Sequence, residues 1–354
     1  MEKTSVYEAL AHHLDHNIVG APMSATLMEM LEIYFPGVEA EVALKLPFSN
    51  HTLSELTKMM SDVAVQLDGI IALMVNRGTV FTEQKPGKDR VYRLLPLVVG
   101  FSETPYWSGK ETAEAKRLAP LWLRYMRESF GRELARGKPV MRVIPIETSL
   151  NHSSEILPFD ALKDMVLKQS FCAVAHCPCR QIKRYAETGC GHSLENCLHF
   201  GVMGRYIVFQ GIGRQITNEE AIKMLTEADE EGLVHTCENM EGYLSTICNC
   251  CGCCCVFLQS VKNGFDALAP SNYTATVDID LCVDCRTCEE RCPMGALTEG
   301  DDAVMHVETG KCIGCGICTP TCPTGAVRLV LKRTVIPPPD PMTLLSLRME
   351  GKSG

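Results

Sequence analysis

Apolar residues recur at helical spacing in the first hundred residues of the chain. Segment 62–76 places four of them on one face of a helix, at Leu67, Ile70, Ile71 and Met74. Gly78 follows, and glycine is the residue that most readily ends a helix. Upstream, Thr52 and Glu55 have the spacing of a capping box, in which each side chain accepts a hydrogen bond from the other residue's backbone. The pattern therefore predicts two helices, over residues 53–60 and 62–76.

Two short strands are expected after these helices, at Thr79–Glu83 and Arg90–Leu95, joined by a Lys-Pro-Gly-Lys turn. Two helices followed by a β-hairpin resemble a winged helix, so residues 1–100 are interpreted as a winged-helix-like module. A helix that reads DNA should present Arg, Lys, Asn or Gln to the bases. The outward positions here are mostly acidic or neutral: Asp62, Gln66, Asp68 and Asn76. A docking or structural role is therefore favoured over nucleic-acid binding.

Residues 101–138 are expected to form connecting helices, interrupted near Pro120 because proline lacks the N–H that a helix interior needs. Basic residues lie among aromatic and aliphatic ones in this segment. They are Lys116, Arg117, Arg124, Arg127, Arg132, Arg136 and Lys138. The pattern fits a solvated helix that covers a core, which we favour over an amphipathic surface for an acidic partner.

Residues 139–270 alternate between strand and helix patterns. We expect strands at Met141–Ile146, Phe171–Val174 and Tyr206–Phe209, and helices at Phe159–Gln169 and 217–231. Thr217 and Glu220 have capping-box spacing at the start of the last helix. Such alternation predicts an α/β unit. Gly211 and Gly213 follow a strand, but the third glycine of a dinucleotide-binding turn is missing, which excludes that class of site.

Composition narrows the class of protein. A chain of 354 residues, 46% hydrophobic and 22% charged, is long enough for two or three domains with a sizeable core. The net charge of −9 disfavours a general nucleic-acid binder. The sequence has no apolar run long enough for a membrane span, and its start lacks the pattern of a signal peptide. We therefore expect a cytoplasmic protein, whose twenty cysteines are ligands or reactive thiols before they are disulfides.

Residues 271–332 contain a repeated cysteine pattern. The same twelve-residue pattern occurs twice, thirty residues apart: Cys-x2-Cys-x2-Cys-x3-Cys-Pro. Its cysteines are Cys282, Cys285, Cys288 and Cys292 in the first copy, and Cys312, Cys315, Cys318 and Cys322 in the second. Zinc sites favour two separated pairs of cysteines, so triplets with a trailing Cys-Pro argue against zinc here.

This segment resembles the two-[4Fe–4S] ferredoxin domains of bacterial type, over residues 274–332. In that family three thiolates of each run ligate one cluster and the fourth reaches the other. The resemblance implies one cluster held by Cys282, Cys285, Cys288 and Cys322, and a second held by Cys312, Cys315, Cys318 and Cys292. Gly314 and Gly316 permit positive φ angles in the second loop. The first copy has Asp284 and Arg286 at the same places.

Twelve further cysteines lie between residues 172 and 255, six of them within 248–255. Consecutive side chains point in different directions, so alternate members are expected to share a site. We expect one site from Cys177, Cys179, Cys190 and Cys197, and a second from Cys248, Cys250, Cys253 and Cys255. Three kinds of site stay open: one or two further Fe–S clusters, which we favour, a structural zinc site, or a reactive-thiol or substrate-binding metal site.

The sequence thus predicts an α+β multidomain protein with five parts. They are a winged-helix-like module (1–100), connecting helices (101–138), a Cys-rich α/β Fe–S or metal domain (139–270), a dicluster ferredoxin fold (271–332) and a Pro-rich tail (333–354). We expect it to pass single electrons between redox partner proteins, as the electron-transfer subunit of an oxidoreductase complex in an anaerobe. The alternatives are a cluster-based reductase with its catalytic site in the Cys-rich middle, and a redox-responsive DNA-binding regulator.

Overall fold

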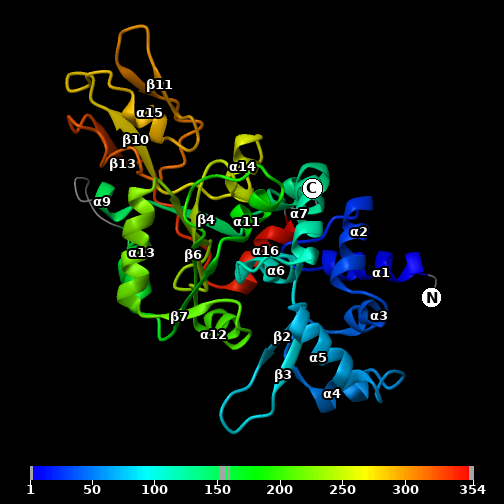
Figure 1. Ribbon diagram of the computed structural model, residues 1–354. Coiled ribbons are helices and arrows are strands. Elements are labelled where there is room, and N and C mark those ends of the chain that lie inside the picture. Colours follow the sequence, from blue (N-terminus) through cyan, green and yellow to red (C-terminus); the bar gives the residue numbers. More distant parts are fainter. Residues whose placement is uncertain (1–2, 151–156, 158–159, 351–354) are drawn as a thin grey trace. The chain divides into compact units, whose positions relative to one another are not determined.

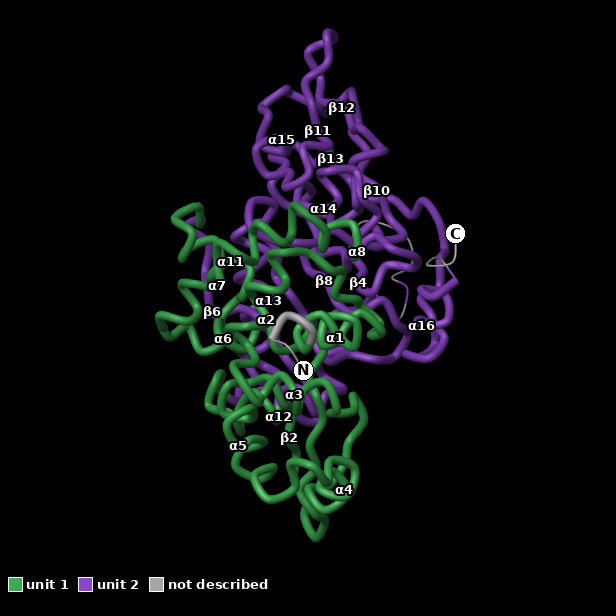
Figure 2. The backbone as a smooth tube through the Cα atoms, turned by 90° about the vertical axis from the view of Figure 1, so that its right-hand side faces the viewer, with its two compact units in different colours: residues 1–133, 175–189, 205–214 green, residues 134–174, 190–204, 215–354 purple. Residues whose placement is uncertain are grey.

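The computed structural model describes residues 3–150, 157 and 160–350, and the chain divides into two compact units (Figure 2). Unit 1 consists of residues 1–133, 175–189 and 205–214, and unit 2 consists of residues 134–174, 190–204 and 215–354. The chain therefore passes between the units several times within the Cys-rich middle. The division into five domains stays a prediction.

Unit 1 is mainly helical (Figure 1). Its helices are α1 (Lys3–Asp15), α2 (Ala25–Tyr34), α3 (Val38–Lys45), α4 (Leu53–Met59), α5 (Leu67–Arg77), α6 (Thr104–Trp107), α7 (Ala113–Tyr125) and α11 (Pro178–Tyr185). Two five-residue segments with π-helical hydrogen bonding, η1 (Leu97–Phe101) and η2 (Met126–Phe130), lie between these helices. Helices α8 (Gly131–Leu134) and α12 (Gly201–Phe209) cross the boundaries between the units.

Helices α4 and α5 and a small sheet form the part of unit 1 interpreted as a winged helix. Strands β1 (His51–Thr52), β3 (Val91–Leu94) and β2 (Val80–Glu83) pair in that order. The capping box is present, since Thr52 Oγ1 accepts from Glu55 N at 3.3 Å and Glu55 Oε2 accepts from Thr52 N at 2.7 Å. Helix α5 begins five residues later than expected, at Leu67, and buries the four predicted apolar residues. The assignment to the winged-helix class itself stays a prediction.

Pro120 does not interrupt the connecting helix, so that expectation was wrong. Helix α7 runs through it from Ala113 to Tyr125. Proline removes one helix hydrogen bond at this position. The loss is offset because the helix buries an apolar stripe on both sides of the proline, comprising Ala115, Leu118, Ala119, Trp122 and Tyr125.

A six-stranded sheet organises the Cys-rich middle. Its order is β4-β8-β9-β6-β5-β7, with β4 (Met141–Ile144), β5 (Cys172–His176), β6 (Glu195–Phe200), β7 (Arg214–Ile216), β8 (Val234–Glu238) and β9 (Thr246–Cys250). The pairs β4–β8, β8–β9 and β6–β9 are antiparallel. Helices α10 (Leu162–Leu167) and α13 (Asn218–Glu230) close one core with the sheet, in which Val174, Leu198 and Ile247 are buried.

Most elements expected in the middle lie within a few residues of their predicted bounds. Phe159, the expected start of α10, lies outside the described residues. Thr217 caps α13, because its Oγ1 accepts from Glu220 N at 3.1 Å. The strand expected at Tyr206–Phe209 was wrong, because these residues end helix α12. A short apolar run has no periodicity that separates a strand from a buried helix.

The C-terminal part of unit 2 is a small α+β fold with two pairs of antiparallel strands (Figure 1). Strand β10 (Tyr273–Val277) pairs with β13 (Val327–Leu331), and β11 (Leu297–Glu299) pairs with β12 (Met305–Val307), both antiparallel. The remaining helices of unit 2 are α9 (Glu147–Leu150), α14 (Val256–Lys262), α15 (Thr287–Arg291) and α16 (Pro341–Glu350).

The tail is only partly an extended arm. After the three prolines 337–339 it forms helix α16, which buries Leu344 and Arg348. The Arg348 guanidinium donates to the carbonyl of Lys138 at 3.2 Å, so the helix docks on unit 2. None of the described helices is both long and apolar enough to cross a membrane.

Candidate metal centres

The two cysteine runs fold as a structural repeat. Four residues at equivalent places have positive φ angles: Asp284 (49°) and Arg286 (59°) in the first run, and Gly314 (69°) and Gly316 (80°) in the second. Glycine takes this conformation without strain, whereas a residue with a Cβ does not. The first loop therefore keeps the same backbone shape as the second although its residues oppose it. A thiolate-lined turn of fixed shape accounts for this conformation.

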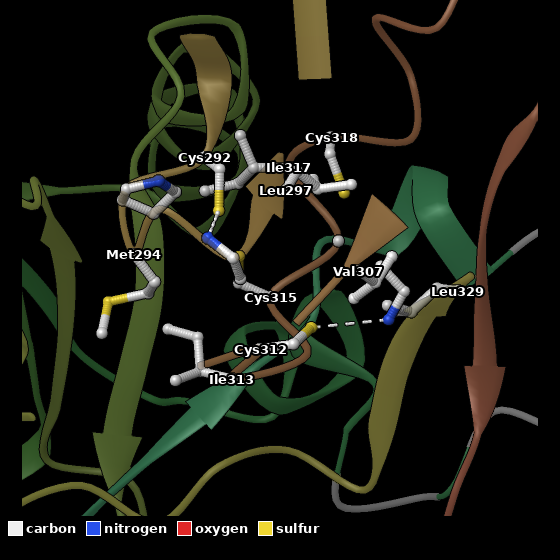
Figure 3. Close-up of a pocket in the computed structure, with 14 residues that line it drawn as sticks. Cys292, Met294, Leu297, Val307, Cys312, Ile313, Cys315, Ile317, Cys318 and Leu329 are labelled. Atoms are coloured by element: carbon white, nitrogen blue, oxygen red, sulfur yellow. Dashed lines mark hydrogen bonds between the residues drawn. The ribbon is translucent and has the colours of Figure 1, made fainter. Parts of the chain in front are cut away.

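Backbone N–H groups point at the sulfurs in a crossed pattern. The N–H of Ala275, in the first repeat, donates to Cys312 Sγ at 3.5 Å. Thirty residues on, the N–H of Met305 in the second repeat donates to Cys282 Sγ, also at 3.5 Å. Cys292 Sγ accepts from the N–H of Ala296 at 3.2 Å. Figure 3 draws the bonds to Cys312 and Cys292 as dashed lines.

The fourth cysteine of the first run lies with the triplet of the second. Cys292, Cys312, Cys315 and Cys318 line one cavity, which is otherwise apolar and includes Ile317 and Leu329 (Figure 3). On the other side of the repeat, the negative charge that Cys322 would carry contributes to a raised pKa of Cys288. Both neighbourhoods are consistent with ligand sets that cross between the two runs, and the ligand assignment itself stays a prediction.

The pKa values of these thiols differ from that of a free cysteine, mainly because the thiols are buried. Burial raises the pKa of Cys288 to about 11 and that of Cys315 to about 12. Burial also raises the pKa of Cys318 well above its ordinary value, with Cys315 and Cys292 adding to the effect. At Cys322 burial acts in the same direction, but hydrogen bonds from the Val327 N–H and from Thr324 outweigh it and lower the pKa. Iron would therefore supply the positive charge that holds the buried sulfurs as thiolates.

The two loops differ in their surroundings. The second loop packs inside unit 2, where Ile146 N–H donates to the Cys315 carbonyl and Ser271 N–H donates to the Ile313 carbonyl, both at 3.0 Å. A Cβ on Gly314 would overlap Ser271 and Tyr273. The first loop is exposed: Ile279 and Val283 each keep 63% of their surface accessible, and Cys285 is exposed.

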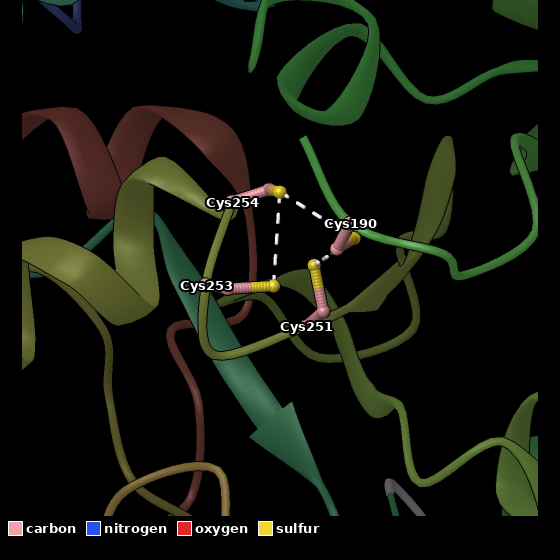
Figure 4. Close-up of side chains that lie close together, drawn as sticks. All are labelled: Cys190, Cys251, Cys253 and Cys254. Carbon is pink, nitrogen blue, oxygen red and sulfur yellow. Dashed lines mark hydrogen bonds between the residues drawn. The ribbon is translucent and has the colours of Figure 1, made fainter. Parts of the chain in front are cut away.

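A second group of thiols lies in the Cys-rich middle. Its members are Cys190, Cys251, Cys253 and Cys254, whose sulfurs all lie within 4.8 Å of one another (Figure 4). In the part of the chain that the structure describes, this is the group of four that is close enough to share one metal ion. Three of its residues come from the turn between β9 and α14, and Cys190 comes from the segment before β6.

The other cysteines predicted as ligands in the middle region are placed as follows. Cys177 precedes α11 and Cys179 lies in its first turn, and a hydrogen bond with Cys179, together with burial, raises the pKa of Cys177 well above its ordinary value. Cys197 is buried on β6, Cys248 and Cys250 lie on β9, and Cys255 directly precedes α14. Their assignment as ligands stays a prediction.

Sequence reasoning missed Cys251 and Cys254. It assumed an extended chain, in which alternate side chains share a face. Residues 252–254 form a turn instead, and a turn brings consecutive side chains to one side. Gly252 and the following apolar helix gave a signal for that turn.

Comparison with known proteins agrees with the C-terminal geometry. Residues 281–327 match the family model of the 4Fe-4S dicluster domain, a range that contains all eight cysteines of the two runs. No curated protein and no solved structure matches the chain. The C-terminal region is thus a 4Fe-4S dicluster domain, and its presence beside many further cysteines suggests iron–sulfur electron transfer.

Proposed function

We propose that this chain, with its 4Fe-4S dicluster domain at residues 281–327, passes single electrons between redox partner proteins as a subunit of an oxidoreductase complex. The observation that supports this most strongly is the crossed repeat, in which each cysteine run receives a backbone N–H from the strand that precedes the other run. In this proposal one cluster is held by Cys282, Cys285, Cys288 and Cys322, and the other by Cys312, Cys315, Cys318 and Cys292. The further thiols of the middle region add a metal centre.

The bound clusters supply one-electron redox chemistry. The chain contributes the rest of the function. N–H donors such as those of Ala275 and Met305 stabilise negative charge on the sulfurs, which favours the reduced state. The apolar lining of the cavity, with Ile317 fully buried, keeps water away from the inner centre.

The exposed first loop is the docking surface in this proposal. Ile279, Leu281 and Val283 are exposed apolar residues at 63%, 39% and 63%, and they flank Cys282. Between residues 278 and 302 the sequence has eight acidic residues and two basic ones. A partner with an apolar contact surface and a basic rim complements both features.

The N-terminal α4–α5–β1–β3–β2 part serves as a winged-helix-type module for protein docking, not for DNA. The exposed residues of α5 include Asp68, Leu73 and Asn76. Arg77, at its end, is paired with Glu39 and Glu114. The Asp68 carboxylate repels a phosphate backbone, and Leu73 and Asn76 offer no positive charge to attract one.

The test is the iron and acid-labile sulfide content of anaerobically purified protein, followed by a reductive titration. Two [4Fe–4S] clusters require about eight iron and about eight sulfide per chain, and take up about two electrons. Cys318→Ser should reduce the iron content by about half. Intact protein with well below about eight iron would contradict the proposal.

A further inference from the structure

The thiol group of the middle region has the spacing of a single metal ion. The sulfur of Cys190 lies 3.9 Å from that of Cys251 and 3.6 Å from that of Cys254, and the sulfurs of Cys253 and Cys254 are 3.7 Å apart. Zinc–thiolate bonds of about 2.3 Å in a tetrahedron place neighbouring sulfurs about 3.8 Å apart. In a four-iron cluster each thiolate binds a different iron, so the sulfurs must lie farther apart.

We infer that Cys190, Cys251, Cys253 and Cys254 bind one Zn²⁺ ion as a structural centre, separate from the two Fe–S clusters. Four thiolates complete the tetrahedron and leave no position open for a substrate or a water, which is the donor set of a structural zinc site. The inference goes beyond the proposed function: it assigns the metal of the middle region and holds whether or not the dicluster domain passes electrons.

The surroundings indicate what the ion stabilises. The ion joins Cys190 to the turn 251–254, about sixty residues away in sequence. Closing so long a loop reduces the conformational entropy of the unfolded chain, as a disulfide does. Cys251 and Cys254 pack against Ala228 and Leu233, at the end of helix α13. The centre therefore ties the β9–α14 turn to the body of unit 2.

The same turn contacts the dicluster domain. A Cβ on Gly252 would overlap the carbonyl of Pro293, the residue after Cys292, so the two backbones are in direct contact. Beside this contact Arg291 donates to the carbonyls of Asp229 and Glu230, at 2.7 and 2.8 Å. The zinc centre thus shapes the surface on which the first cysteine run packs.

The experiment compares zinc and iron per chain in full-length wild-type protein, Cys253→Ser and Cys254→Ser, all purified anaerobically. Cys172→Ser is the matched control, because Cys172 is a buried thiol that lies outside the group and donates to Asn218. We expect about one zinc in wild type and in the control, and at least a tenfold loss of zinc in both variants. The iron content and the absorption of the dicluster domain should stay unchanged. Thermal unfolding should occur at a lower temperature in the two variants than in the control.

Loss of iron instead of zinc in Cys253→Ser would overturn the inference, since the thiols would then hold an iron centre. Unchanged zinc in both variants would overturn it as well. Because Cys253 is exposed, its replacement by serine disturbs little packing and the variant is expected to fold. As a second readout, wild-type protein with zinc exchanged for Co²⁺ should show thiolate-to-cobalt charge transfer and tetrahedral d–d bands, and octahedral bands would exclude the site. Wild-type protein that contained about one zinc but well below about eight iron would contradict the proposed function and leave this inference standing.

Discussion

At position 314 a glycine is required by space as well as by backbone angle. Its φ is 69°, and a Cβ would overlap Ser271 Oγ and the carbonyl of Tyr273. The equivalent Asp284 has the same kind of angle, 49°, but lies in the exposed loop. One backbone shape is therefore compatible with different residues, depending on what packs against the loop.

This comparison gives a prediction for single residues. Gly314→Ala should lower the free energy of unfolding of the cluster-loaded protein by at least about 2 kcal/mol, because strain and overlap add. Asp284→Gly should leave it within about 1 kcal/mol of wild type, since glycine relieves the strained angle at an added entropic cost. Anaerobic urea denaturation, followed by the cluster absorption, measures both. Equal effects of the two substitutions would contradict the packing argument.

At the scale of elements, Arg291 joins two parts of unit 2. It extends from the end of α15 in the first repeat and donates to two carbonyls in the last turn of α13. The Asp229 carbonyl also accepts from the N–H of Gly232 at 3.0 Å, whereas the Glu230 carbonyl, at the last residue of the helix, depends on Arg291. A cation at this end of the helix also interacts favourably with the helix dipole.

We therefore expect Arg291→Ala to lower the free energy of unfolding by about 1–2 kcal/mol. Arg291→Lys should recover part of this, because an ammonium can reach one carbonyl but lacks the planar fork. Arg328→Ala, at an exposed position on β13, is the control and should change stability by less than about 0.5 kcal/mol. The transition temperature of anaerobic protein reports the differences. A Lys variant as unstable as the Ala variant would favour a packing role for the guanidinium.

Elements were predictable where local chemistry defines them. The Thr52 and Thr217 caps and the two cysteine runs each depend on residues within one turn, and the structure has them where they were expected. The helix through Pro120 and the helical end of α12 depend on burial against distant residues, which a local pattern does not contain. The middle thiol group depends on the fold in the same way, because Cys190 meets Cys251 only after the strands between them have paired.

For the whole molecule, charge is distributed unevenly over the dicluster repeat. Within the first repeat, residues 278–302 include eight acidic and two basic residues, and Arg286 is paired with Glu299. The equivalent stretch of the second repeat, 308–332, has one acidic and three basic residues. The exposed loop of the first repeat therefore presents a negative potential, which attracts cationic reactants and is screened by salt.

The rate at which small reductants reduce the protein should reveal this potential. With a cationic reductant, the reduced form of methyl viologen, the rate should fall several-fold as ionic strength rises from about 0.01 M to about 0.15 M. With anionic dithionite the rate should rise over the same range of ionic strength.

The double variant Asp280→Asn/Glu290→Gln removes two exposed charges of the first repeat. It should weaken the dependence of both rates on ionic strength. The control Asp68→Asn/Glu219→Gln changes the net charge equally outside the repeat and should keep the wild-type slopes. Anaerobic stopped-flow absorption measures the rates. If both double variants gave the same slopes, net charge alone would govern the encounter, and the first loop would lose its role as the docking surface.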